Sequence, residues 1–322
     1  MVIRRDIQPL WYGTRFARCG QRGGTARVWS VHDKVINLIY QDELLALALP
    51  QAGGSSRFLC LSSLPNLKVG DTLNLVGGLS GRIKYQDDNA GLNAFSIPLS
   101  GLTLWQGPFE PETSADLTPQ QLSAFKEALH AVEIQLNLPS IDLSPKTAFC
   151  WIGLGQGLTP AGDDVLVGYL AIDNHLGQDR DWTEAMGKAV TAGLHKTTKL
   201  SAQLLRCALS RDYHEYIQQV LAILCGTSNE NLLTAMRRVA QVGASSGENI
   251  LYGMWLAMER ILRKTGVGHE SGTEETATEG TDTEGADTEG ADTEGTDTEV
   301  TGCPDLSDLF PSTAPKRGST LV

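Results

Sequence analysis

The sequence predicts an α+β protein in which a small β-barrel or sandwich-like domain precedes a mainly α-helical domain and a disordered C-terminal tail. Three observations predict this fold class. Short apolar or alternating runs, broken by turn residues about every eight to twelve positions, fill residues 25–110. Helical periodicity takes over within residues 111–265. Acidic five-residue units without large apolar side chains then repeat within residues 266–322, so this tail cannot form a core.

The predicted β-rich domain, residues 25–110, follows an N-terminal segment of residues 1–24. This segment contains several arginines but no apolar stretch behind them, so it does not resemble a secretory signal. Its aromatic residues Trp11, Tyr12 and Phe16 favour a folded edge over an organellar transit peptide, which stays open as the alternative. The expected strands are residues 25–31, 35–40, 44–49, 57–61, 72–76 and 81–85.

The second domain should be built from helices, the first of which starts at Thr118 and Pro119. One strand is expected within it, at residues 147–152, where Phe149, Cys150 and Trp151 suggest a buried run. The expected helices are residues 119–136, 160–176, 182–195, 198–209, 213–224, 230–240 and 247–264.

Charge and cysteine usage limit the classes of function. The net charge of −12 lies entirely in residues 266–322, and residues 1–265 balance 24 acidic against 24 basic side chains. A neutral body gives no reason to expect nucleic acid or an anionic membrane as a partner. The six cysteines show no metal-binding spacing, so free thiols in a reducing cytoplasm are expected.

The chemistry is expected at a glycine-rich stretch that joins the predicted strand to a helix, W-I-G-L-G-Q-G-L-T-P-A-G-D-D. Gly153, Gly155 and Gly157 alternate, which lets the backbone take unusual angles or approach a ligand closely. Thr159 offers an N-cap hydroxyl and Pro160 suits the first helical position. Backbone N–H groups at such a helix start bind anions.

Asp163 and Asp164 fall in the first turn of that helix. They are the candidate catalytic carboxylates and candidate ligands of Mg²⁺, which often accompanies a phosphate-bearing substrate. Either could instead serve only the helix dipole, and the residues leave both roles open. The spacing matches neither the P-loop nor the dinucleotide fingerprint.

Two further clusters of small polar residues open helices in the same domain. Thr197 and Thr198 lie in H-K-T-T-K-L-S, and Ser245 and Ser246 lie in G-A-S-S-G-E-N. Capping alone is the commoner role for any one of them, but three such helix starts suggest one shared anion pocket. In the first domain, Asn37 is a candidate substrate contact, whereas His32 is expected to make a structural hydrogen bond. The substrate-binding candidates are Asn37, Gly155, Gly157, Thr159, Thr197, Thr198, Ser245 and Ser246.

These motifs together resemble one bacterial family, the family that includes the AllH subunit of oxamate carbamoyltransferase. The resemblance rests on G-L-G-Q-G-L-T-P-A-G-D-D-V-L-V-G, T-T-K-L-S, G-A-S-S-G-E-N-I-L-Y-G and V-H-D-K-V-I-N-L, and covers most of residues 25–262. Gln156 and Ala161 stand where the family pattern suggests Pro and Ser, and Glu248-Asn249 where it suggests Ala-Asp.

The resemblance implies a cytoplasmic enzyme of anaerobic allantoin breakdown. Oxalurate and phosphate would become oxamate and carbamoyl phosphate, in a complex with an FdrA-like subunit and a third subunit. No Ser/His/Asp triad or Cys/His pair can be assembled from spacing, so the residues leave two alternatives open. One is a non-catalytic assembly subunit of an FdrA-like complex. The other is an anion-binding enzyme that acts on another carbamoyl or acyl substrate, linked to coenzyme A or a nucleotide.

Overall fold

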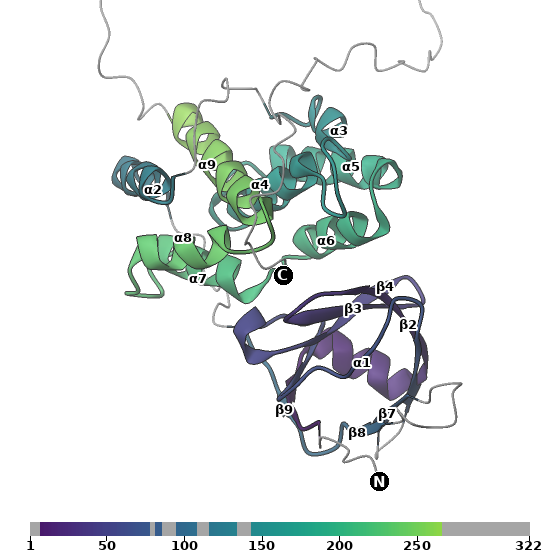
Figure 1. Cartoon of the computed structure of the whole chain (residues 1–322). Coiled ribbons are helices and arrows are strands. Elements are labelled where there is room, and N and C mark those ends of the chain that lie inside the picture. The colour runs from purple at the N-terminus through teal and green to yellow at the C-terminus, as the bar shows by residue number, and fades with distance from the viewer. Residues whose placement is uncertain (1–6, 78–80, 86–94, 108–115, 134–142, 266–322) are drawn as a thin grey trace, which may run out of the picture.

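The fold is the predicted succession of a β-rich part and a helical part. The structure, a computed structural model, describes residues 7–77, 81–85, 95–107, 116–133 and 143–265. A curled nine-stranded sheet comes first within these residues, and the helices follow it along the chain (Figure 1). The expected disordered tail, residues 266–322, lies outside the described residues.

The sheet contains all six expected strands, each within one residue of its expected ends, and three more. Its order is β8-β7-β6-β2-β3-β4-β5-β1-β9, with parallel pairing only between β4 and β5 and between β1 and β9 in the described part. The strands are β1 (Pro9–Tyr12), β2 (Gly24–Val31), β3 (Val35–Tyr40), β4 (Glu43–Ala48), β5 (Phe58–Leu61), β6 (Thr72–Val76), β7 (Arg82–Tyr85), β8 (Phe95–Pro98) and β9 (Thr103–Leu104).

The N-terminal segment forms part of this sheet and its core. Trp11 and Tyr12 lie in β1, next to the edge strand β9. Helix α1 (Thr14–Arg22), which the sequence analysis did not predict, packs inside the curl of the sheet (Figure 1). Phe16 and Cys19 form the buried, apolar side of this helix. The arginines between them interrupt the apolar periodicity, so the sequence shows no clear helical pattern there. The backbone N–H groups of Arg15 and Phe16 donate to Ser56 O and tie α1 to the loop before β5.

The two faces of the central strands pack in two different apolar clusters. One face of β3 and β4 belongs to the core of the sheet domain and includes Leu38 and Leu45. The opposite face carries a smaller apolar cluster that includes Val35, Ala46 and Phe58. Burial on both faces explains why residues 44–48 form an almost continuous apolar run.

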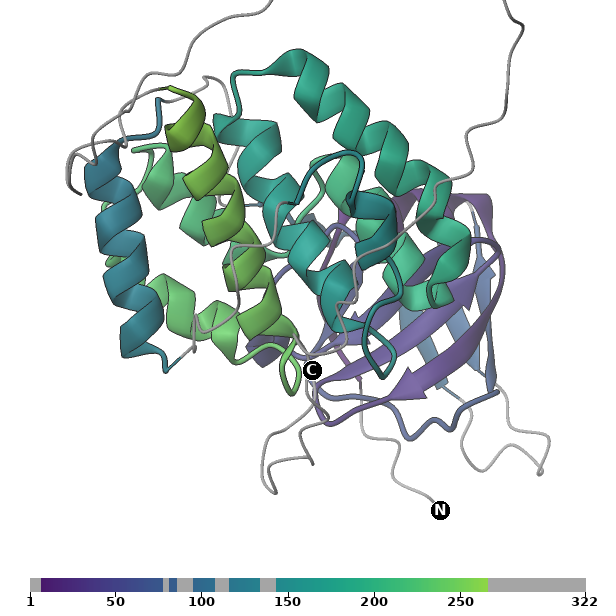
Figure 2. The same cartoon turned by 90° about the horizontal axis from the view of Figure 1, so that it is seen from above.

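The helical domain contains every expected helix within the described residues (Figure 2). The last residues of the first expected helix, 134–136, lie outside them. The helices are α2 (Pro119–Ala131), α3 (Ala148–Trp151), α4 (Ala161–Leu176), α5 (Arg180–Gly193), α6 (Lys199–Leu209), α7 (Glu215–Leu224), α8 (Leu232–Ala240) and α9 (Ser246–Lys264).

The strand expected at residues 147–152 is wrong, because this segment contains the short helix α3. Its first turn is closed by hydrogen bonds from Ala148 N to Ser144 O, 2.8 Å, and from Ser144 N to Thr147 Oγ1, 2.9 Å. Ala148 and Trp151, three residues apart, share its buried side. A short apolar run cannot be assigned to strand or helix from its periodicity alone, which is why the prediction failed.

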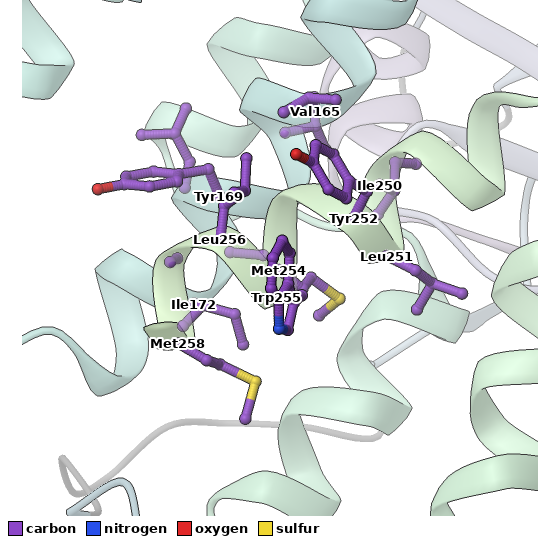
Figure 3. Packing of buried hydrophobic residues seen from close by; sticks show 14 of the residues in the cluster. Val165, Tyr169, Ile172, Ile250, Leu251, Tyr252, Met254, Trp255, Leu256 and Met258 are labelled. Atoms are coloured by element: carbon purple, nitrogen blue, oxygen red, sulfur yellow. The ribbon is translucent and has the colours of Figure 1, made fainter. Parts of the chain in front are cut away.

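Helices α4 and α9 form the centre of the helical core (Figure 3). Their backbones touch at two glycines: a Cβ on Gly168 would lie 1.9 Å from Ile250 O, and one on Gly253 would lie 1.9 Å from Val165 O. This contact fixes the start of α4 against the start of α9. Of the helices in the described part of the chain, none combines the length and apolar composition needed to cross a bilayer.

Candidate functional site

The two domains are joined by polar contacts between the loop before β5 and the start of α7. Gly54 N donates to Glu215 Oε2, 2.5 Å, and Glu215 N donates to Gly54 O, 2.8 Å. Asp212 Oδ2 accepts from Arg15 Nε, 2.7 Å, and from Ser56 Oγ, 2.6 Å. These bonds connect the sheet domain directly to the helical domain.

A chamber of about 160 Å³ lies beside this junction, with walls from both domains. The sheet domain contributes Val35, Leu44 and Phe58 to its apolar lining, and the helical domain contributes the rest. The side chains of polar or titratable type in its lining are Asn37, Arg57, Thr159, Asp164, Cys207, Asp212, Tyr213, His214 and Ser246. Pockets for drug-sized ligands run from about 300 to 1,000 Å³, so this chamber suits a smaller molecule.

The glycine-rich loop leads to the chamber wall. Gly153, Gly155 and Gly157 have φ of 77°, 109° and 95°, a region that side chains disfavour, so the expected unusual backbone angles are confirmed. A Cβ on Gly153 would lie 2.6 Å from Lys196 O, and one on Gly155 would lie 2.8 Å from Ala161 N. The first two glycines therefore let the loop fold back on its neighbours.

The start of α4 differs from the expected cap. Pro160, not Thr159, is the N-cap residue, and the Thr159 hydroxyl pairs instead with Ser246 Oγ at 2.9 Å. The N–H groups of Asp163 and Asp164 donate to Pro160 O, and Gly162 N donates to Leu154 O. These donors of the first turn are engaged within the chain.

Asp163 joins three parts of the helical domain. Its carboxylate is fully buried, and Oδ1 accepts from Gly153 N at 2.9 Å. Oδ2 accepts from Ser201 Oγ, 2.7 Å, and from the Thr197 hydroxyl. Asp163 does not line the chamber. Its hydrogen bonds instead connect the glycine-rich loop to the start of α6.

Asp164 faces the chamber and is only 3% exposed. Its Oδ2 is buried and has no hydrogen-bond partner among the described residues. Burial raises the pKa of Asp164 to about 8, hydrogen bonds from Ser246 and Thr159 oppose this rise, and the negative charge of Asp163 adds to it. At neutral pH the Asp164 carboxyl is thus mostly protonated and can donate as well as accept.

The three expected helix starts do converge. Thr159 contacts Ser246, and Thr198 Oγ1 donates to Leu158 O at 2.5 Å. Thr198 also caps α6 by accepting from Ser201 N at 3.0 Å, the commoner role weighed for it. Ser245 is exposed and makes no side-chain cap bond.

Only part of the predicted set reaches the chamber. Those that line it are Asn37, Thr159, Asp164 and Ser246, whereas Gly155, Gly157, Asp163, Thr197, Thr198 and Ser245 do not. Asn37 Nδ2 also donates to Ser30 Oγ at 2.9 Å, and His32 Nε2 lies 3.0 Å from the same hydroxyl. His32 has the structural hydrogen bond that was favoured for it.

The sequence analysis missed the chamber residues at the domain junction. His214 Nε2 lies 2.9 Å from Ala52 O, and His214 Nδ1 accepts from Tyr216 N at 3.3 Å. Burial lowers the pKa of His214 to about 4, and the charge of Arg57 lowers it further against the opposing effect of the Ala52 carbonyl. His214 is a neutral, fully engaged side chain. The polar run D-Y-H-E between two helical patterns was the available signal.

The described residues contain no group of three or more His, Cys, Asp or Glu side chains that could hold a metal ion. Within the described residues, free thiols are found at Cys19, Cys60, Cys207 and Cys225.

These features define an α+β protein with a small polar chamber between a curled sheet and a helical region. Residues 151–258 match the family described as oxamate carbamoyltransferase subunit AllH, so the resemblance suggested by the motifs is confirmed over these residues. The match begins at the glycine-rich loop and ends within α9, which leaves the sheet domain outside it. The family description is that of a subunit, which supports a chain that works in a complex. No solved structure shows a significant match to the chain.

Proposed function

We propose that this chain is a subunit of an oxamate carbamoyltransferase-like enzyme and that the chamber at Asp164 holds its small carbamoyl-bearing substrate. In this reaction oxalurate and phosphate give oxamate and carbamoyl phosphate, in anaerobic allantoin breakdown in the cytoplasm. The observation that carries the proposal is the buried Asp164 oxygen without a partner in the described structure. A buried polar atom of this kind is costly unless a ligand completes its hydrogen bonding.

The chemistry of Asp164 suits a carbamoyl group. A protonated carboxyl can donate to the carbonyl oxygen and stabilise the negative charge that develops there when phosphate attacks. Ser246 and Thr159, whose hydroxyls pair with each other at 2.9 Å, lie in the same lining and add polar groups beside this carboxyl. The small chamber volume also favours this substrate class over the coenzyme A or nucleotide-linked alternative.

Other subunits are expected to be required for turnover. Burial raises the pKa of the Cys207 thiol, and both ring nitrogens of His214 are engaged, so neither offers an activated nucleophile or free base in the chamber. We therefore propose the FdrA-like subunit and a third subunit of the same complex as partners.

Magnesium remains an expectation that rests on Asp164. Both oxygens of Asp163 are engaged by donors of the protein, and Asp164 alone of the expected pair faces the chamber. One carboxylate with a raised pKa is a poor fit to Mg²⁺, which prefers several oxygen ligands, so no step is assigned to the ion. Calorimetric titration of MgCl₂ with and without phosphate, on wild type and Asp164→Asn, tests this expectation.

An assembly role is the second candidate, and the exposed tip of the glycine-rich loop favours it. Gly155 and Gly157 are exposed there, and Leu158 beside them is 44% exposed. In this reading the tip docks on a partner subunit. Gly157→Ala would then weaken assembly, although the chamber itself is unchanged.

The deciding experiment measures phosphate-dependent cleavage of oxalurate by this chain alone, by the two partners alone and by the mixture. Activity is expected only in the mixture, and Asp164→Asn should reduce it at least a hundredfold, the scale of one lost transition-state donor. Asp181→Asn, an exposed first-turn aspartate outside the chamber, is the matched control. Gel filtration shows whether the complex still forms. Full activity without this chain would overturn the enzyme proposal, and loss of assembly in Asp164→Asn would favour the assembly role.

A further inference from the structure

The sheet domain contributes a buried cation to the chamber. Arg57, the residue before β5, is 8% exposed and lines the chamber. Its guanidinium has no hydrogen bond or ion pair with any residue in the described part of the chain; only its backbone N–H donates, to Ser55 Oγ. Arginine is almost never buried unless it is paired, so the missing partner points to a ligand.

The position of this charge follows from its effect on its neighbours. The Arg57 charge lowers the pKa of His214 and opposes the burial that raises the pKa of Cys207, and both side chains line the chamber. It is not among the groups that act on Asp164. The Arg57 side chain thus adds a positive charge to the same lining that holds His214 and Cys207.

The other acidic side chain of the lining, Asp212, is paired with different residues. Asp212 Oδ2 is taken by Arg15 and Ser56, and no ion pair joins Asp212 to Arg57 in the described structure. The chamber thus presents a cation without a partner in the described structure, and the buried Asp164 carboxyl, whose Oδ2 also has no partner there. A ligand that supplies the missing partners of both Arg57 and Asp164 must be anionic at one end and carry a carbonyl or amide at the other.

We propose that Arg57 binds the anionic end of the ligand whose carbonyl or amide end meets Asp164. The ligand class is a short amide or ureido acid with a carboxylate, or its phosphate counterpart, because a guanidinium pairs bidentately with either group. This inference rests on the proposed function. It adds that the sheet domain, through Arg57, selects substrates that carry a negative charge. It lies outside the family match, which begins at Trp151.

The test measures binding of three probes to the full chain and to the reconstituted complex by calorimetry: oxamate, inorganic phosphate, and oxamide, in which an uncharged amide replaces the carboxylate of oxamate. Wild type should bind an anion at least tenfold more tightly than oxamide. Arg57→Gln should lose at least tenfold in affinity for that anion and keep its affinity for oxamide. Arg57→Lys should recover part of the loss, since it keeps the charge without the planar fork. Comparison of oxamate with phosphate shows which anion the site takes.

Arg27→Gln is the matched control, an exposed arginine on β2 of the same sheet, and it should change no affinity. Because Arg57 has no partner to lose, Arg57→Gln should fold with an undiminished melting temperature in the absence of ligand. Equal anion binding by wild type and Arg57→Gln overturns the inference, as does failure of wild type to bind either anion. If anions bind through Arg57 but the complex does not cleave oxalurate, the proposed function fails and the inference stands. If oxalurate is cleaved and Arg57→Gln leaves KM unchanged, the inference fails alone.

Discussion

Two neighbouring aspartates have different surroundings because their side chains point in different directions from the same helix. Asp163 and Asp164 are identical in type and adjacent in sequence, but successive residues of a helix point about 100° apart. One carboxylate therefore meets the glycine-rich loop and α6, and the other meets the chamber. The sequence could mark the pair as special but could not assign different surroundings to its two members.

Asp164 should make stability depend on pH. Its pKa is 3.8 ordinarily and about 8 in the folded protein, so between these values the folded state holds one proton more than the unfolded chain. The contribution of Asp164 to the free energy of unfolding is therefore fully present below pH 3.8. It is lost as the pH rises toward 8, at up to about 1.4 kcal/mol per pH unit. Urea unfolding from pH 4 to 9 should show this slope in wild type and a flatter curve for Asp164→Asn. Parallel curves for the two proteins would contradict the raised pKa.

Asp163 should act mainly through stability. Asp163→Ala leaves the buried donors of Gly153, Thr197 and Ser201 without their acceptor, which should lower the free energy of unfolding by about 3 kcal/mol or more. Thr197→Val, which removes one of these donors, should cost about 1 kcal/mol. Urea unfolding measures both changes. Activity per folded molecule tests the catalytic role expected for Asp163: a large loss in a folded, assembled variant would support that role over the structural one.

At the scale of elements, the sequence predicted best where one pattern governed a whole segment. Alternation located the central strands, and helical periodicity located the helices from α4 to α9. Strand β1, helix α1 and the short strands β8 and β9 were missed, because each is too short or too polar to show a period. Their order in the sheet depends on contacts between distant segments, which no local pattern contains.

The crossing of α4 and α9 should be sensitive to a single methyl group. Gly168→Ala places a Cβ against the backbone carbonyl of Ile250, which cannot rotate away, so the helices must separate. We expect a loss of about 3 kcal/mol by overpacking, measured by urea unfolding. Gly187→Ala in α5 is the control, because its Cβ would meet only Leu209 Cδ2 at 3.6 Å. This control should be stabilised by up to about 1 kcal/mol through helix propensity, and an equal loss in both variants would refute the argument.

At the scale of the molecule, the sequence predicted two domains but not the chamber between them. Asn37 was proposed as a ligand contact, yet its place in the same lining as Asp164 becomes visible only once both domains are placed. Arg57 gave no signal, since a single arginine before a strand is ordinary in a sequence. The helix starts were found because they concentrate glycine, serine and threonine, whereas the junction residues depend on a tertiary arrangement.

The domain junction should hold the two halves in one cooperative unit. Asp212→Ala removes the acceptor of Arg15 and Ser56 across the junction, and we expect a loss of about 2 kcal/mol in unfolding free energy. Differential scanning calorimetry should then resolve separate transitions for the sheet domain and the helical domain. Glu230→Gln, which breaks an ion pair with Arg238 inside the helical domain, should leave the transitions coupled. Two transitions in wild type itself would show that the junction does not couple the domains.

The residues that line the chamber lie far apart in the sequence, so the ribosome synthesises them at very different times. Asn37 and Arg57 emerge first, Asp164 follows about a hundred residues later, and Ser246 comes near the end of the described chain. The sheet domain has all its described strands before α2 begins, so it can fold while the rest is still being made. A nascent or prematurely terminated chain that lacks α9 would have eight of the nine polar or titratable lining residues but would lack Ser246 and Ile250. The lining is therefore complete only after α9 has been made.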